Sequence, residues 1–172
     1  MSALVWRPLR PADLSAVAAM ADAVHVDFYE RPAVLAERLH LAPTGCHLLE
    51  RAGRALGYVL SHPWRDGHLP PLDTLLTALP ATPDTWYIHD LCLLPEARGT
   101  GSAAEIVAHL QAVARAAGLP TLSLVAVNGS VPFWQRQGFV VLDRPGLTQK
   151  LLSYEPEARY MAQALIGAED LK

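Results

Sequence analysis

A short segment rich in glycine and hydroxyl side chains, residues 98–103, carries the clearest chemical signal in the sequence. It follows an aromatic and branched stretch, residues 86–94, and precedes a run of apolar residues at helical spacing that begins near Ser102. This order predicts a strand, a loop and a helix in direct succession. The first amides of a helix lack internal acceptors and carry the positive end of its dipole, and glycine lets backbone approach a ligand closely. The segment therefore suits a phosphate or pyrophosphate.

Two common nucleotide-binding loops do not account for this segment. Gly99, Gly101 and Ala104 fit the dinucleotide pattern Gly-x-Gly-x-x-Gly/Ala, but that site needs an acidic residue about 20 positions later to bind a ribose hydroxyl. The sequence has no Asp or Glu between Glu105 and Asp143. A Walker loop is also excluded, because no Gly-Lys-Ser/Thr follows the glycines.

Two motifs in sequence order indicate a different ligand. Residues 93–101 read Leu-Leu-Pro-Glu-Ala-Arg-Gly-Thr-Gly, and residues 128–139 begin with Asn128 and end with Gly138 and Phe139. The chain thereby resembles the GNAT superfamily of N-acetyltransferases, most closely over residues 86–143. The resemblance implies one α/β domain with a mixed, mostly antiparallel central sheet of six to seven strands and helices on both faces. It also implies transfer of an acetyl group from acetyl-CoA to a primary amine of a small molecule or peptide, by direct attack in a ternary complex.

The resemblance further implies where coenzyme A would bind. Arg98 would contact the pyrophosphate or hold the loop, and the loop residues that would bind it are Gly99, Thr100, Gly101, Ser102 and Ala103. The strand at residues 86–94 would splay from the strand at residues 119–127. The pantetheine arm would lie in that gap, against backbone groups of Leu91, Cys92 and Leu93. Asn128 and Phe133 would also contact the cofactor, although Asn128 before Gly129 fits a simple turn equally well.

Acetylation of an amine needs a group that removes a proton, since an alkylammonium has a pKa of about 10.4. In a regular strand, His89 would share one face with Tyr87 and Leu91, and Asp90 would share the other with Ile88. We favour His89 as the base, with Asp90 as its competitor and a structural role for both as the third alternative. A β-bulge in this strand, a common feature of the family it resembles, would reverse the faces locally.

Trp134 stands where the resemblance places a tyrosine that protonates the departing thiolate. An indole N–H donates a hydrogen bond but is not a usable acid. Either Trp134 only stabilises the sulfur, or another group such as Tyr87 or a water donates the proton, or catalysis is weakened. Packing of Trp134 beside Phe133 as a wall of the cofactor site is the alternative role. The same substitution favours an alternative function, a non-catalytic acyl-CoA-binding or regulatory module that keeps the loop without the acid.

The remaining elements are predicted from apolar periodicity and turn residues. An edge strand at residues 3–10 precedes helices that begin at residue 11 and at residue 32, and a hairpin of residues 46–51 and 55–62. A proline-rich loop at residues 63–84 contains one short helical piece, residues 72–79. After the strand at 119–127 come a helix at residues 130–137, strands at residues 139–142 and 148–154, and a C-terminal helix within residues 155–168.

The composition of the chain limits the kinds of molecule that it is expected to bind. At 172 residues the chain suits one domain, and a net charge of −3 without a basic cluster argues against nucleic acid. Its apolar runs are shorter than a membrane span, and no secretory signal is visible. Cys46 and Cys92 are expected as buried thiols, so we expect a cytoplasmic protein without disulfides.

The sequence says less about the acceptor and the assembly. Residues 11–41 contain five acidic residues against two arginines, which fits solvated helix faces or a site for a cationic amine, with Asp27 and Glu30 as the substrate-binding candidates. His62 and His68 match no metal-site spacing, so we expect core or solvated histidines and no metal. The C-terminal helix and the habit of the family it resembles suggest a homodimer.

Overall fold

The computed structural model describes residues 2–165, which form a seven-stranded sheet in the order β1-β2-β3-β4-β5-β7-β6. All neighbouring strands are antiparallel except β4 and β5, which are parallel. The expected mixed, mostly antiparallel sheet is therefore confirmed. The strands are β1 (Val5–Pro8), β2 (His47–Arg51), β3 (Arg54–Trp64), β4 (Thr85–Leu93), β5 (Thr121–Ala126), β6 (Val140–Val141) and β7 (Arg159–Ala164).

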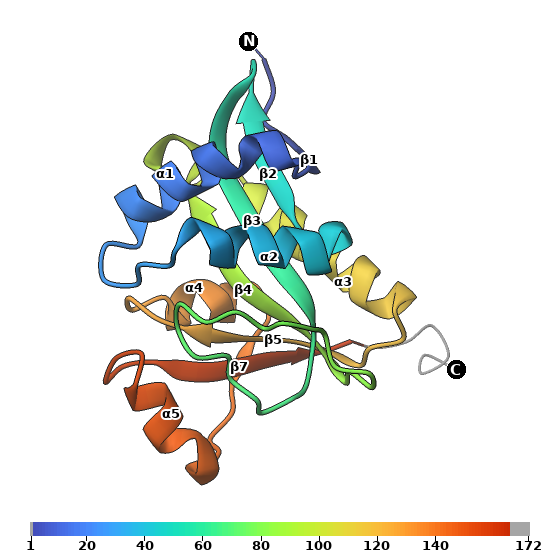
Figure 1. Cartoon of the computed structure of the whole chain (residues 1–172), viewed down its shortest axis with the longest axis vertical. Coiled ribbons are helices and arrows are strands. Elements are labelled where there is room, and N and C mark those ends of the chain that lie inside the picture. Colours follow the sequence, from blue (N-terminus) through green and yellow to red (C-terminus); the bar gives the residue numbers. More distant parts are fainter. Residues whose placement is uncertain (1, 166–172) are drawn as a thin grey trace.

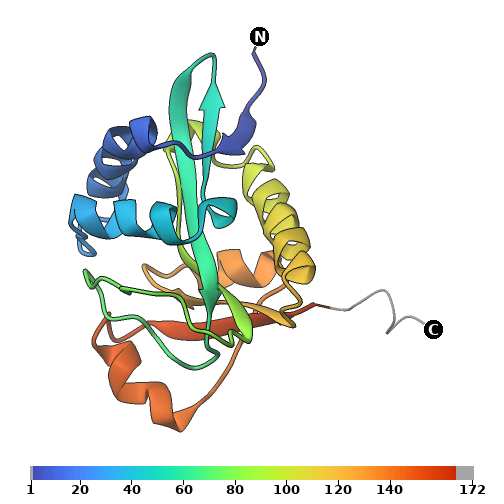
Figure 2. The same cartoon turned by 45° about the vertical axis from the view of Figure 1, so that its right-hand side comes forward.

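Helices cover both faces of this sheet (Figures 1 and 2). One face carries α1 (Leu14–Val24) and α2 (Pro32–Leu41), and the other carries α3 (Ser102–Ala116) and α4 (Val131–Arg136). A fifth helix, α5 (Thr148–Leu152), lies beyond β7 at the other end of the molecule from β1. Each face has its own apolar core, one beneath α1 and α2 and one beneath α3 and α4.

The helix α3 is held against the sheet by its apolar stripe and by one polar contact at its start. Ile106, Leu110 and Ala114 recur at steps of four and are buried in the same core as the β5 residue Leu122. The indole N–H of Trp6 in β1 donates to the carbonyl of Ser102 at 2.9 Å. The glycine-rich loop that precedes α3 therefore ends at a helix N-terminus whose position is fixed by these contacts.

An extra residue in β4 changes which side chains share a face. Leu60 of β3 pairs with Asp90, but the next residue, Ser61, pairs with Ile88, so His89 is the additional residue of a β-bulge. Beyond the bulge, Leu91 packs against the core beneath α3, as Ile88 does. The expectation that Asp90 shares a face with Ile88 is therefore wrong. Asp90 instead faces α1 and α2, the side to which His89 also points.

The strands β4 and β5 part at the same place. Their parallel pairing joins only Trp86–Ile88 to Leu122–Leu124. The predicted splay between the two strands is thereby confirmed, and it starts where the bulge begins.

The expected C-terminal helix is wrong over residues 159–164, which form β7 between β5 and β6. Its apolar residues share a helical face, but they also suit a strand that is buried on both sides. The neighbours Tyr160 and Met161 point to opposite faces of the sheet and are 1% and 0% exposed. Residues 166–168 of the expected helix lie outside the described residues.

Two smaller expectations also fail. Residues 148–154 were expected to pair with the preceding strand, but β7 takes that place and residues 148–152 form α5 after a turn at Pro145. Residues 72–79 contain no helix in the structure. The N-terminal strand, the first two helices, the hairpin and the helix at residues 131–136 are confirmed.

The connection from β3 to β4, residues 65–84, is here called the strap. It has no helix or strand and is fastened to α2 by polar contacts. Glu37 accepts hydrogen bonds from the backbone N–H groups of Leu76 at 2.6 Å and Thr77 at 3.0 Å, and buried Arg38 donates to the carbonyl of Thr74. Since these contacts satisfy backbone groups of a long irregular segment, they fix its course.

None of the helices among residues 2–165 is long and apolar enough to cross a bilayer.

Removal of the Glu37 carboxylate should loosen the strap. Glu37→Ala leaves two backbone donors and the Arg38 guanidinium without this acceptor, so we expect the free energy of unfolding to fall by about 1–3 kcal/mol in chemical denaturation. The matched control is Glu96→Ala, which breaks an exposed pair with Arg54 and should cost less than about 1 kcal/mol. Equal losses in the two variants would contradict the role given to Glu37.

Candidate functional site

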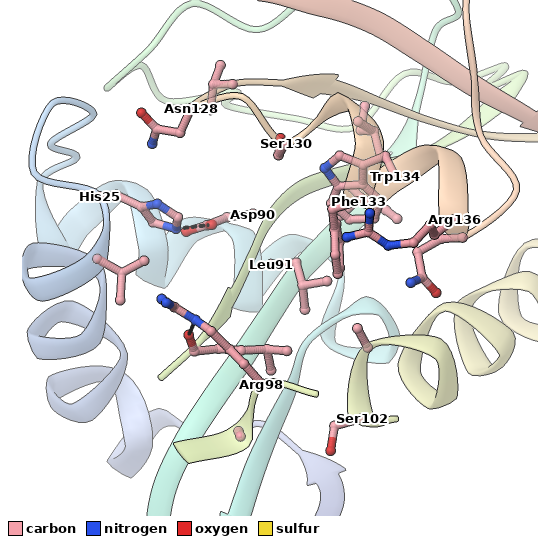
Figure 3. Close-up of a pocket in the computed structure, with 18 of the residues that line it drawn as sticks. His25, Asp90, Leu91, Arg98, Ser102, Asn128, Ser130, Phe133, Trp134 and Arg136 are labelled. Carbon is pink, nitrogen blue, oxygen red and sulfur yellow. Dashed lines mark hydrogen bonds and ion pairs between the residues drawn. The ribbon is translucent and has the colours of Figure 1, made fainter. Parts of the chain in front are cut away.

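A cavity of about 890 Å³ lies in the gap between β4 and β5. Figure 3 shows Arg98 and Ser102 at one side of it, Phe133, Trp134 and Arg136 at another, and the His25–Asp90 pair at its end. The cavity therefore joins the start of α3 to the acid and base side chains beside the bulge. Its lining includes the predicted residues Asp27, His89, Asp90, Leu91, Leu93, Arg98, Gly99, Thr100, Gly101, Ser102, Ala103, Asn128, Phe133 and Trp134.

The glycine-rich loop has a backbone conformation that requires its glycines. Gly99 and Gly101 have φ values of 70° and 85°, in the left-handed region that favours glycine. The Thr100 hydroxyl donates to the carbonyl of Ala97 at 2.6 Å, and the Arg98 guanidinium donates to the carbonyl of Leu93 at 3.1 Å. Arg98 thus holds the loop against the end of β4, which was one of its two expected roles.

Aromatic residues of α4 form the opposite wall. Trp134 is 7% exposed, and its ring meets those of Phe133 and Phe139 edge to face at 5.0 and 5.3 Å between centroids. Asn128 lies on the rim with a φ of 54°, and its N–H donates to the Glu155 carboxylate at 2.7 Å. Asn128 therefore forms the turn and lines the cavity, so both of its expected roles are compatible with its position.

The Cys92 side chain does not reach this cavity. It is 1% exposed in the core beneath α1 and α2, where burial raises the pKa of its thiol to about 12. Cys46 is likewise buried, as expected for both thiols. Only backbone groups of Cys92 remain as candidates for cofactor contact.

A second, smaller cavity of about 70 Å³ adjoins the first. Five residues line both cavities, so a molecule in the smaller one faces the contents of the larger. These shared residues are His25, His89, Asp90, Val125 and Val127. The rest of the smaller lining comes from the α1–α2 connection, the strap, β4 and the segment that follows α5, and consists of Phe28, Glu30, Pro70, Leu72, Tyr87 and Tyr154.

Two histidine and carboxylate pairs lie where the cavities meet. His25 Nε2 is 2.6 Å from Asp90 Oδ1, and His89 Nε2 is 2.6 Å from Glu30 Oε1. The Tyr58 hydroxyl donates to Asp90 Oδ2, so both oxygens of that carboxylate have partners. The bulge is what brings the adjacent residues His89 and Asp90 to the same side of β4.

His25 is the site residue that sequence reasoning missed. It follows the last residue of α1 and carries no motif, and only the fold brings it to Asp90, 65 positions later in the chain. The predicted substrate residues separate, because Asp27 lines the larger cavity and Glu30 the smaller one.

Burial and charge act in opposite directions on these groups. Burial lowers the pKa of His25, but the Asp90 contact and the Glu30 charge outweigh it, so the His25 pKa is raised above 6.5. Burial raises the pKa of Glu30, but His89 outweighs it, so the Glu30 pKa is lowered and its carboxylate is ionised at neutral pH. The site thus holds a buried carboxylate, Glu30, and an imidazole, His25, whose pKa is raised.

The other predicted histidines lie outside the two cavities. His62 is fully buried beside Tyr87, and burial lowers its pKa to about 3, whereas His68 is exposed. This confirms the expected core and solvated positions. Across residues 2–165 no three His, Cys, Asp or Glu side chains gather in a way that could hold a metal ion.

The raised pKa of His25 can be tested directly. In a proton NMR titration, we expect the His25 pKa to lie above 6.5 and to fall in Asp90→Asn, because the variant removes the facing charge. His62, whose pKa is about 3, serves as the internal control and should not titrate between about pH 5 and 8. A histidine whose pKa is higher in the folded state than in the unfolded state stabilises the fold at pH values below its unfolded-state pKa. This contribution is lost as the pH rises through the folded-state pKa, so Asp90→Asn should lower stability more at acidic than at alkaline pH. An unchanged His25 titration would contradict the assignment.

Several solved structures share this architecture. Ard1 from Thermoplasma volcanium superposes with a TM-score of 0.72 at 15% identity, covering 96% of this chain and 99% of that chain. The loading GNATL domain of CurA from Lyngbya majuscula gives 0.76 at 14% identity, covering 95% and 98%. N-acetylglutamate synthase from Neisseria gonorrhoeae, complexed with coenzyme A and N-acetyl-glutamate, gives 0.72 at 15% identity, covering 97% of this chain but 36% of that one. At these identities the likeness establishes the fold alone.

Sequence comparison identifies the family. No curated protein sequence matches the chain significantly. The profile of the acetyltransferase (GNAT) family matches residues 14–139, most of the chain from α1 to the end of the second motif. With the matching architecture of the neighbouring structures, the match is sufficient to conclude that the chain belongs to the acetyltransferase (GNAT) family.

Proposed function

We propose that the protein is an N-acetyltransferase that moves an acetyl group from acetyl-CoA to a primary amine. The observation that carries this proposal is one continuous cavity from the glycine-rich loop, through the gap between β4 and β5, to two histidine and carboxylate pairs. A pyrophosphate, an extended arm and a reacting thioester need three such regions in this order. Structures that contain coenzyme A are found among the fold neighbours, including the N-acetylglutamate synthase and a NatC complex.

The residues at the start of α3 suit the pyrophosphate. The first-turn amides of this helix, 15 residues long, have no intrahelical acceptors, and the left-handed Gly99 and Gly101 leave the loop backbone open. A Cβ added at Gly101 would meet no atom within 4 Å, so the space beside it is free. Backbone groups of Leu91 and Leu93, where β4 has parted from β5, are available to an extended arm.

We assign the proton transfer to His25 with Asp90. Acetyl-CoA supplies the thioester carbonyl that the amine attacks, and the attacking amine must be uncharged. The carboxylate of Asp90, 2.6 Å from His25 Nε2, stabilises the imidazolium that forms. His25 accepts the proton that leaves the ammonium, and water would carry the second N–H proton, lost after the amine has attacked, to the sulfur as the C–S bond breaks.

His89, the base favoured from the sequence, is the competitor in this scheme. Its side chain is 8% exposed and hydrogen-bonded to Glu30, whereas the His25 side chain is 20% exposed. A base must reach its substrate, so the exposure favours His25, and we give His89 and Glu30 the role of holding the amine. Trp134 forms the cofactor wall, and no tyrosine among residues 2–165 lines the larger cavity to act as the acid.

Kinetics as a function of pH separate the two histidines. His25 accepts a proton only when neutral, so kcat/KM should rise with pH through a pKa above 6.5. His25→Ala should lower kcat/KM by about 10²–10⁴-fold and remove this limb of the profile. His89→Ala is the matched comparison, expected to lower the rate but keep the limb. A limb that persists in His25→Ala and disappears in His89→Ala would assign the base to His89 instead.

Cofactor binding can be tested without turnover. Gly101→Glu places a charged side chain in the free space beside the loop, so we expect the Kd for coenzyme A, measured by calorimetry, to rise by at least about tenfold. Gly118→Glu is a matched control at the other end of α3, with a similar φ of 73° and similarly open surroundings. It carries the same strain and charge away from the cavity, and an equal loss of affinity in both variants would count against the loop site.

The alternative, a non-catalytic acyl-CoA-binding module, is favoured by Trp134 at the expected tyrosine position. A thiol-release assay with acetyl-CoA and a panel of amines distinguishes it from the enzyme. Binding of coenzyme A without thiol release on any amine would support the module.

A further inference from the structure

The smaller cavity has the character of an acceptor site whose chemistry selects one class of amine. It adjoins the larger cavity at His25, His89 and Asp90, the groups assigned above to proton transfer and amine binding. An amine that enters it therefore faces the reacting end of the cofactor cavity. The inference below rests on the proposed function and concerns only the acceptor.

The acidic groups of this cavity are two carboxylates, each of which faces a histidine of the same lining. Glu30 and Asp90 line it, and among residues 2–165 no Lys or Arg does so. The buried guanidinium of Arg38 is near Glu30 but lies outside the lining, where it donates to Glu37 at 3.0 Å and to the Thr74 carbonyl at 3.2 Å. An acceptor that carries its own carboxylate would thus meet two acids without a lysine or arginine to pair with it.

The remaining walls are apolar and aromatic. They come from β4, β5 and the residue after it, the α1–α2 connection, the strap and the segment that follows α5, and comprise Phe28, Pro70, Leu72, Tyr87, Val125, Val127 and Tyr154. Tyr87 lines this cavity and is 4% exposed. Aromatic faces beside carboxylates suit an ammonium head attached to an apolar body.

The far side of the cavity is closed by two segments that contact each other. The hydroxyl of Tyr154, two residues after the end of α5, donates to the carbonyl of Pro70 in the strap, which joins the two walls. The strap itself is fastened near Leu72, because the Asp73 N–H donates to Glu30 at 3.2 Å and Arg31 contacts the Asp73 carboxylate at 3.1 Å. The available volume of about 70 Å³ is therefore bounded and suits a compact group.

We propose that the acceptor is a small primary amine with a compact apolar or aromatic arm and no carboxylate. The ammonium lies toward Asp90 and Glu30, and the arm lies against the rings and aliphatic side chains. Amino acids and extended peptides are disfavoured, the first by the unpaired charge and the second by the closed wall.

Matched acceptors test the proposal in a thiol-release assay with acetyl-CoA. The pairs are 2-phenylethylamine with phenylalanine and isobutylamine with valine, each differing by one carboxylate. We expect each amine to exceed its amino acid in kcat/KM by at least about tenfold, and the corresponding amino acid amides, which keep the size without the charge, to recover most of the difference. A tripeptide amide that begins with phenylalanine should be slower than 2-phenylethylamine.

A positive charge added at the wall should weaken the preference for amines over amino acids. Leu72→Arg supplies the missing cation at a residue that is 37% exposed, so the preference for amine over amino acid should fall at least about threefold. Leu75→Arg is the matched control, because Leu75 lies on the same strap and is 43% exposed but lines neither cavity. The control should keep the wild-type preference.

The outcomes separate this proposal from the proposed function. Acetylation of amines with a preference for amino acids or for the tripeptide would overturn the acceptor class and leave the N-acetyltransferase function standing. An equal change of preference in Leu72→Arg and Leu75→Arg would show that this cavity does not bind the acceptor arm. Coenzyme A binding without acetylation of any amine would overturn both.

Discussion

The site depends on one extra residue in the central strand. Strand β4 pairs with β3 on one side over its length, but with β5 on the other side only over Trp86–Ile88. His89 is accommodated as a bulge, and from there the two parallel strands separate. The separation opens the larger cavity, and the change of face directs His89 and Asp90 together toward α1 and α2. A regular strand would close the gap against β5 and point one of these two side chains into the other core.

Buried charge explains how the surrounding elements are arranged. Glu30 and Asp90 are carboxylates that the fold removes largely from water, which is unfavourable unless each has partners. Asp90 is held by Tyr58 and His25, and Glu30 by His89 and the backbone of Asp73. These contacts join β3, the α1–α2 connection and the strap to the bulge. The long strap is therefore part of the site, and its attachment through Glu37 and Arg31 bounds the smaller cavity.

The fold was predictable where local signals were strong. The spacing of apolar residues at 102–116 predicts only an amphipathic helix, and these residues form α3 in the structure. The run at residues 158–165 is different, because a strand buried on both faces and a helix with one apolar face can share the same residues. Tyr160 and Met161 are both buried because both faces of β7 are covered, Met161 by the core beneath α3 and Tyr160 by the strap. Neither α3 nor the strap is near in sequence to residue 160, so local periodicity could not select between the two structures.

By itself, the sequence determined the family, the candidate phosphate loop at residues 99–103 and the candidate pair His89 and Asp90, because these depend on residue types at short, fixed spacings. Only the tertiary structure decided that both side chains face the same way, that His25 joins Asp90, and that the strap and Tyr154 bound the smaller cavity. Each of these decisions rests on strand register or on contacts between distant segments. Register sets the direction of every side chain along a strand, and a single bulge reverses it without leaving a mark in the local pattern.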